Sequence, residues 1–171
     1  IAIINKKISG QPLNKFMKEK IIKPAKLSDT YLYHIFMPTI PENHVYGFQT
    51  VNGKTSLNDL WHVDGVYGDG NMYSSVEDLF KWEQLLYTNK IVKQTTFTKA
   101  LQPAPLSDGS TYPYGFGWFI AKQDSIFMHT GGWAGFLNLI CRDVVKNRTL
   151  IVLTSGSSYM GIPLGQSLFL N

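Results

Sequence analysis

The chain has 171 residues, of which 44% are hydrophobic and 13% aromatic, which is enough for one domain with a core and excludes a disordered chain. Its formal net charge is +4, and the densest basic stretch, from Lys15 to Lys26, fits a solvated helix face better than a nucleic-acid or membrane patch. No apolar run approaches the roughly 18 residues of a membrane helix, and the single cysteine excludes an internal disulfide.

Two helices are predicted at the start of the chain. Residues 1–8 resemble the tail of a helix that ends at Ser9-Gly10, because glycine favours the left-handed conformation that closes a helix. Pro12 suits the first turn of a second helix, which we expect Pro24 to end. The apolar positions of this second helix keep helical spacing: Leu13, Phe16, Met17 and Ile21. The chain opens without Met, which favours a piece of a longer protein.

Residues 27–71 follow neither a helical nor a strand period and are punctuated by proline and glycine turns. Within them, Asn52-Gly53 is typical of a tight hairpin turn, and Tyr46-Gly47-Phe48 could belong to the same small hairpin. The glycines of residues 65–70 invite a phosphate-loop interpretation. Their order is reversed relative to G-x-G-x-x-G and no clear strand precedes them, so we expect a tight loop instead.

A helix over residues 76–87 is the best-supported local prediction. Ser74 with Glu77, and Ser75 with Asp78, form overlapping capping boxes that start it. Its expected apolar stripe comprises Val76, Leu79, Phe80 and Leu86. A shorter helix is predicted over residues 95–101.

The last third of the chain changes to a strand pattern. Four strands separated by short polar turns are predicted over residues 115–121, 125–131, 135–142 and 148–154. Short links, of which Lys146-Asn147 is the clearest, make consecutive strands antiparallel neighbours. Residues 161–171 start another segment that could be helical. Helices followed by an antiparallel meander indicate an α+β fold in which the helices cover one face of the sheet.

The most informative motif is His129-Thr130-Gly131-Gly132, which lies between two apolar runs. An imidazole and a hydroxyl can hold a polar substrate group, and the glycines let a ligand approach the backbone. A strand-end histidine followed by a glycine turn is an equally simple interpretation of these four residues. Cys141 lies in an apolar run and is expected to be a packed small hydrophobe rather than a nucleophile.

Metal-binding and sugar-binding sites have weaker support in the sequence than the His129 motif has. The four histidines, His34, His44, His62 and His129, lack the H-x-H or H-x-x-x-H spacing of paired ligands, and His62 with Asp64 is a close mixed pair. We therefore expect no metal and no cofactor. Several aromatic residues could line a sugar-binding surface but more often form a core or a cleft wall: Trp61, Tyr67, Tyr73, Tyr112, Tyr114, Trp118 and Trp133.

Taken in order, several segments resemble the C-terminal half of the serine hydrolase superfamily of class C beta-lactamases, penicillin-binding proteins, D-aminopeptidases and related esterases. Residues 3–10 resemble the helix after the family's Y-x-N motif, and residues 16–24 the next helix with its I-x-x-P ending. Residues 68–79 resemble the glycine-rich loop and S-x-x-D-L helix. Residues 114–118 resemble the strand before the H-T-G strand, and residues 129–136 resemble H-x-G-x-x-x-G-F. The resemblance covers nearly the whole chain.

The resemblance implies roles for the motif. In the family, the serine of S-x-x-K attacks an acyl carbon, and the K/H-T-G strand forms the opposite wall of the cleft. His129 would then act electrostatically, Thr130 and Gly131 would bind the substrate carboxylate or amide, and the Gly132 N–H would supply half of the oxyanion hole. Since histidine replaces lysine, the fixed positive charge is weaker and carboxylate-bearing beta-lactams are a less secure substrate.

The chain departs from the family pattern in one large respect. No serine is followed three residues later by lysine. Tyr87-Thr88-Asn89 formally satisfies Y-x-N, but it follows the capped helix and is too near His129 in sequence. We therefore expect residues 1–171 to be the C-terminal portion of such a domain. Helices and loops would occupy residues 1–113, antiparallel strands 114–155, and a truncated segment 156–171.

This interpretation predicts a fragment of a serine acyl hydrolase that is inactive alone. Its partners would be a small-molecule or peptide acyl substrate and the missing N-terminal half of the same domain, with no nucleic acid and no membrane span. A periplasmic or secreted location is implied by the resemblance alone. The alternative is a non-catalytic peptidoglycan- or sugar-binding module that uses the aromatic cleft wall.

Overall fold

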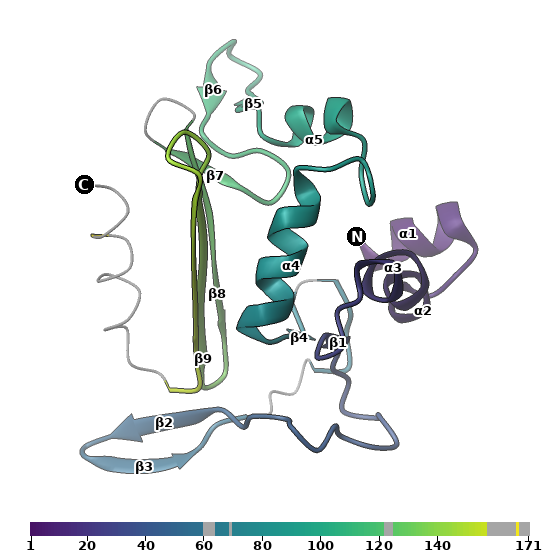
Figure 1. The fold of residues 1–171 in the computed structure, drawn as a ribbon. Coiled ribbons are helices and arrows are strands. Elements are labelled where there is room, and N and C mark those ends of the chain that lie inside the picture. Colours follow the sequence, from purple (N-terminus) through teal and green to yellow (C-terminus); the bar gives the residue numbers. More distant parts are fainter. Residues whose placement is uncertain (60–63, 69, 122–124, 157–166, 168–171) are drawn as a thin grey trace.

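An antiparallel sheet and a helix that runs alongside it form the centre of the molecule (Figure 1). The computed structural model describes residues 1–59, 64–68, 70–121, 125–156 and 167. The sheet has the strand order β10-β9-β8-β7, formed by β7 (Phe119–Ala121), β8 (Ile126–Trp133), β9 (Phe136–Asp143) and β10 (Arg148–Thr154). The α+β prediction, with consecutive strands as antiparallel neighbours, is confirmed.

The helix beside the sheet is α4 (Val76–Leu86), and α5 (Gln94–Ala100) follows it at one end. The hydroxyl of Ser75 accepts a hydrogen bond from the N–H of Asp78, so the second of the two predicted capping boxes starts α4. The predicted apolar stripe is partly wrong, because Val76 and Phe80 are exposed while Asp78 and Glu83 are buried. Leu86 is buried, as predicted. Polar side chains occupy the packed face because each has partners there, which are described below.

The N-terminal helices lie on the side of α4 away from the sheet (Figure 1). They are α1 (Ala2–Ser9), α2 (Leu13–Met17), a π-helical turn η1 (Lys18–Ile22) and α3 (Lys23–Ala25). Gly10 closes α1 in the left-handed conformation, at φ 70°, as predicted. The prediction that Pro24 ends the second helix is wrong by one residue, since the wider π turn precedes Pro24 and the helical path continues to Ala25.

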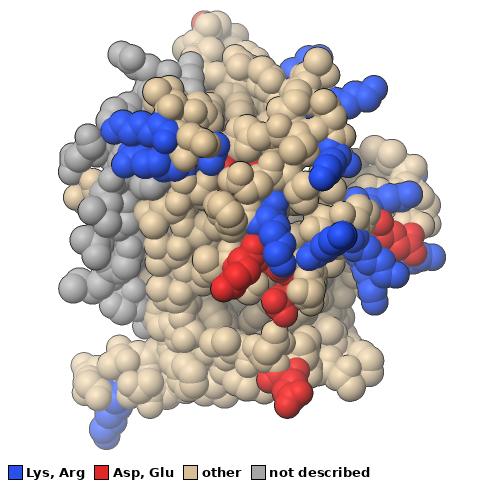
Figure 2. Space-filling view, viewed as in Figure 1, with Lys and Arg blue, Asp and Glu red and all other residues tan. Residues whose placement is uncertain are grey.

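The lysines of this region are exposed, and Figure 2 shows them gathered over these helices with acidic side chains among them.

Three two-stranded pairs complete the described fold. β2 (Phe48–Val51) and β3 (Lys54–Leu57) form the predicted hairpin, and its turn residues Asn52 and Gly53 both have positive φ. β1 (Tyr31–Leu32) pairs with β4 (Met72–Tyr73), and β5 (Ala104–Pro105) pairs with β6 (Thr111–Tyr112). None of the helices in the described ranges is long and apolar enough to cross a membrane.

Strand β7 is shorter than its predicted range of 115–121. Gly117 has φ 83°, and a Cβ at Gly115 would lie 2.0 Å from the carbonyl oxygen of Ala100. These two glycines therefore make a turn pressed against the end of α5 rather than a strand. The prediction for residues 161–171 lies outside the described residues except for Ser167.

The core is centred on Ile126, Leu139 and Cys141. Side chains alternate between the two faces of a strand, and the register places these three on the face opposite to His129. Cys141 is buried and is in the reduced state, as predicted for a packed small hydrophobe.

Candidate functional site

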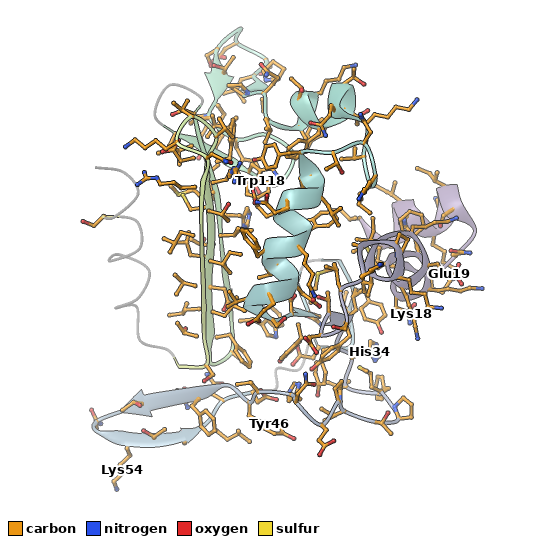
Figure 3. The ribbon with its side chains drawn as sticks, viewed as in Figure 1. Lys18, Glu19, His34, Tyr46, Lys54 and Trp118 are labelled. Carbon is orange, nitrogen blue, oxygen red and sulfur yellow. The ribbon has the colours of Figure 1, made fainter. Side chains whose placement is uncertain are left out.

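A cavity of about 670 Å³ lies between the sheet, the first turn of α4 and the β1–β4 pair. Figure 3 shows side chains projecting into the space between the sheet and α4. Residues of the predicted motif, His129, Thr130 and Gly131, line this cavity. Gly132 is exposed at the next position of β8 and is not among the lining residues. The volume is of the size that holds a small-molecule ligand or a short peptide segment.

His129 is half-buried on β8 with both ring nitrogens in hydrogen bonds. Its Nε2 lies 2.9 Å from the hydroxyl of Tyr114, and its Nδ1 lies 2.5 Å from the carbonyl oxygen of Thr130. A carbonyl oxygen only accepts, so Nδ1 carries the proton and, in the neutral ring, Nε2 accepts from Tyr114. The ring is therefore fixed in one orientation at the cavity wall.

Two aromatic side chains pack against the His129 ring. Tyr114 and Phe119 lie at ring-centroid distances of 6.0 and 5.7 Å from it. A second cavity of about 390 Å³, bordered by His129 and Trp118, opens on this side. Tyr114 belongs to the segment that the sequence singled out before the motif. Its hydrogen bond to His129 could not be predicted from that resemblance.

The strand that carries the motif has an open edge. β7 pairs with β8 only as far as Met128, so among the residues described, His129 to Trp133 has a sheet neighbour only in β9. Backbone N–H and C=O groups on that edge can bind an extended ligand as an added strand.

Gly131 and Gly132 keep the open edge bare. A Cβ at Gly131 would meet Asn138 at 3.7 Å, and one at Gly132 would meet Leu137 at 3.5 Å, both of which are ordinary contacts. Packing against the described residues therefore does not require glycine at these positions. Glycine at both positions leaves the exposed backbone of β8 accessible to a ligand.

A buried carboxylate anchors the end of β8. Trp133 Nε1 donates a hydrogen bond of 2.6 Å to Asp64 Oδ1, and Asp64 is almost completely buried. Asn71, buried at φ 67°, donates from Nδ2 to the carbonyl oxygens of Asp64 and Val66. Asp64 and Asn71, on either side of the glycine segment, thus fix the end of the motif strand. Sequence reasoning assigned neither Asp64 nor Asn71 to the site.

Of the described serines, Ser74, Ser75 and Ser155 line the cavity, and the hydroxyls of the first two take part in structural hydrogen bonds. Ser75 caps α4, and the Ser74 hydroxyl lies 2.8 Å from the Thr30 hydroxyl. Among the described residues no group of three or more His, Cys, Asp or Glu side chains is placed to hold a metal ion. His62, of the pair His62 and Asp64, lies outside the described residues.

The wall opposite the motif is aromatic. Tyr31 and Tyr73, directly opposed in the β1–β4 register, stack with centroids 5.5 Å apart and planes at 15°. Burial, followed by the charge of Asp59, raises the pKa of Tyr31 to about 12, and burial likewise raises the pKa of Tyr73. Both phenols are therefore neutral hydrogen-bond donors at physiological pH.

Both the sequence and the fold of this chain are similar to those of known proteins. The sequence matches the profile of the Beta-lactamase family over residues 2–162. It is 30% identical over 168 residues to penicillin-binding protein 4* of Bacillus subtilis, an alignment that covers 91% of this chain and 37% of that protein. The chain thus spans well under half the length of this curated relative.

Solved structures share the fold. The penicillin-binding protein from Bacillus halodurans superposes with a TM-score of 0.83 at 20% identity, covering 99% of this chain and 52% of that one. The D-amino acid amidase from Ochrobactrum anthropi, solved with L-phenylalanine amide, superposes with a TM-score of 0.74 at 20% identity, covering 98% and 53%. The sheet and its helices therefore have the architecture of part of these proteins.

Proposed function

Because this chain belongs to the Beta-lactamase family, we propose that it carries the substrate-binding wall of a serine acyl hydrolase that cleaves an amide, an ester or a D-amino-acid peptide. The observation that carries the proposal is the open edge of β8, where Thr130 and Gly131 border a cavity of about 670 Å³. An acyl substrate laid along that edge would meet backbone donors, a hydroxyl and an oriented imidazole.

Each motif residue has a definite part in this proposal. Thr130 would donate its hydroxyl to a substrate carboxylate or amide oxygen at the open edge, from the face of β8 opposite to His129, with the Gly131 backbone beside it. Gly132 would direct its N–H at the oxyanion, and a preorganised donor of this kind contributes about 3 kcal/mol to the transition state. His129 would orient the strand and act electrostatically on the substrate, from a ring whose position is held by Tyr114 and by the Thr130 carbonyl.

The nucleophile would come from outside this sequence. No serine in the 171 residues begins S-x-x-K, and of the cavity serines Ser74, Ser75 and Ser155, the first two have their hydroxyls in structural hydrogen bonds. We propose that the part of the relatives' length that this chain does not span supplies the serine, its base and the tyrosine of Y-x-N. Action on cell-wall peptides would place the intact protein in the periplasm or outside the cell.

The test compares the 171-residue chain with the full-length protein on a chromogenic cephalosporin and a p-nitrophenyl ester. We expect turnover by the full-length protein alone. His129→Ala should lower kcat/KM about 100-fold, because a small displacement of the strand misplaces every group on it. Lys54→Ala, at an exposed position on the β2–β3 hairpin, is the matched control and should change nothing. Clear turnover by the short chain that survives His129→Ala would refute the proposal.

A binding module is the second candidate, favoured by the stacked Tyr31 and Tyr73 on the cavity wall. Stacked aromatic residues suit the apolar face of a sugar ring. This candidate predicts saturable binding of a peptidoglycan fragment by the full-length protein, with no acyl turnover and no S-x-x-K in the coding sequence upstream of Ile1. Finding S-x-x-K there would favour the hydrolase.

A further inference from the structure

A buried relay of three side chains lies behind the aromatic wall of the cavity. The hydroxyl of Tyr31 is 2.6 Å from Nδ1 of His44. Nε2 of His44 lies 3.6 Å from Oδ2 of Asp59, and the two side chains are 1% and 3% exposed. The other oxygen of Asp59 accepts a hydrogen bond of 2.7 Å from the Gly47 N–H, at the base of the β2–β3 hairpin.

The relay holds the His44 ring at both of its nitrogens. The Tyr31 hydroxyl and Nδ1 of His44 share one hydrogen bond, whose donor depends on the His44 tautomer. Nε2 of His44 faces the Asp59 carboxylate. Tyr46, labelled in Figure 3, packs edge-on against the His44 ring with centroids 4.8 Å apart. The imidazole is thus held on its edges and on its face.

The relay determines what Tyr31 offers to a ligand. Its hydroxyl is occupied by His44, so the part that remains available at the cavity is the ring. That ring stacks on Tyr73, and Tyr73 meets Phe136 edge-on at 5.5 Å. Tyr31, Tyr73 and Phe136 line the same cavity as His129 and Thr130. A fixed aromatic wall therefore faces the proposed acyl-binding strand.

We propose that Tyr31, held by His44 and Asp59, forms with Tyr73 and Phe136 a subsite for an aromatic side chain on the acyl part of the substrate. This inference rests on the proposed function and specifies its substrate class. Aromatic groups bind aromatic walls in stacked or edge-on arrangements, and a wall that is already rigid loses little entropy when it binds. Tyr31 is a specificity-determining residue in this proposal, and His44 and Asp59 are positioning residues.

The experiment measures kcat/KM of the full-length protein for p-nitrophenyl phenylacetate and p-nitrophenyl propionate. We expect the wild type to prefer the phenylacetyl ester. Tyr31→Leu should lower that preference about tenfold, mainly through KM of the aromatic ester, since even one substrate methylene in an apolar pocket is worth roughly 10- to 200-fold in such comparisons. Tyr31→Phe retains the ring but releases it from His44, and should lower the preference about threefold. Tyr112→Leu, an exposed tyrosine on β6, is the matched control.

The outcomes separate a subsite from a structural role. An equal loss of activity on both esters in Tyr31→Leu would overturn the subsite, because a general folding defect does not distinguish acyl groups. A Tyr31→Phe variant indistinguishable from wild type would overturn the role of the relay.

A binding measurement keeps the subsite testable if no ester is turned over at all. That result would defeat the proposed hydrolase but leave the aromatic wall in place. Titration of the full-length protein with phenylacetamide and with propionamide, followed by NMR, then decides. Phenylacetamide should bind more tightly, and Tyr31→Leu should remove that advantage while Tyr112→Leu retains it. Equal binding of the two amides by the wild-type protein would overturn the subsite independently of catalysis.

Discussion

Asp78 is a fully buried carboxylate that joins α4 to the segment before β1. It accepts hydrogen bonds from the Asp29 N–H at 2.7 Å, the Thr30 hydroxyl at 3.0 Å and Lys81 Nζ at 2.9 Å. Burial raises the pKa of Asp78, but the hydrogen bonds from Lys81, Asp29 and Thr30 outweigh it, and the pKa is lowered below its usual 3.8. The charged form is therefore the one that the fold stabilises.

This lowered pKa predicts an acid-dependent loss of stability. A group whose pKa is lower in the folded than in the unfolded protein contributes stability above the unfolded value, and that contribution disappears as pH falls through the folded pKa. Asp78→Asn should destabilise the chain by about 2 kcal/mol at pH 7, the scale of hydrogen bonds to a charged group. Urea denaturation from pH 7 to pH 2 should show the gap between wild type and variant closing below about pH 4. A gap that stays constant over this range would contradict the assignment.

Cys141 provides a second prediction at a single residue. Burial, and secondarily the charge of Asp143, raises the pKa of its thiol from 9.0 to about 11. Since the thiolate is the reactive form, the native protein should react with a disulfide reagent at pH 8 about 100-fold more slowly than the urea-unfolded protein. Equal rates in the two states would show that the thiol is accessible, contrary to its burial in the core.

At the scale of single residues, the sequence pointed to some of the residues around the cavity and not to others. The His129 to Gly132 motif could be found because its residues are adjacent and the flanking strands have a clear period. Tyr31, His44 and Asp59 come together only through the irregular segment between β1 and β4, where no period constrains the path of the chain. Their contact depends on tertiary packing, as does that of Trp133 with Asp64. Residue type alone could not reveal these pairings.

At the scale of elements, α4 is held to the sheet by a buried polar bridge. Glu83 lies 3.2 Å from Nε of Arg142 on β9 and accepts a hydrogen bond of 3.0 Å from Thr149 on β10. Arg142 also lies over the ring of Tyr87, 4.7 Å from its centroid. Tyr87 therefore ends α4 as a packing residue, in keeping with the rejection of Tyr87-Thr88-Asn89 as a catalytic motif.

This bridge explains why the apolar stripe of α4 was predicted only in part. A periodicity argument assigns buried positions to apolar residues, whereas Glu83 and Asp78 are buried with charged or polar partners on other elements. The existence and limits of α4 followed from its cap and its period. Which face it buries was decided by partners 59 and 66 residues further along the chain, at Arg142 and Thr149.

Breaking one side of the bridge should cost more than removing both. Glu83→Gln leaves the Arg142 charge buried without a carboxylate, and we expect a loss of about 3–5 kcal/mol in the free energy of unfolding. Glu83→Leu combined with Arg142→Leu removes both charges and should cost less than the sum of the two single changes. Urea denaturation of the wild type, Glu83→Leu, Arg142→Leu and the double variant forms the cycle, with Lys90→Ala, an exposed residue after α4, as the control. Simple additivity would mean that the two groups do not stabilise each other.

At the scale of the whole molecule, several large apolar side chains have no cover from the described residues. Ile8 on α1 is 82% exposed and Phe80 on α4 is 50% exposed. The chain spans 37% to 53% of the relatives named above, so we infer that the remainder of such a protein covers part of this surface. The α+β architecture could be predicted from the order of helices and strands. The uncovered surface could not, because exposure depends on what packs against it.

Lysine substitutions at these positions should have opposite consequences in the short and the long protein. In the 171-residue chain, Ile8→Lys and Phe80→Lys place a charge in solvent, so the free energy of unfolding should change by less than about 0.5 kcal/mol and binding of a hydrophobic dye should fall. In the full-length protein the same lysines would be buried against the covering segment, and each should cost about 1–3 kcal/mol. Val145→Lys, in the turn between β9 and β10, is the matched control, because Val145 is 77% exposed at a turn of the sheet.

Urea denaturation of the 171-residue chain and of the full-length protein, each with and without the substitution, measures the change in the free energy of unfolding. If Ile8→Lys and Phe80→Lys are as harmless in the long protein as in the short one, the remainder of the protein leaves this face open and the inferred completion of the domain is wrong.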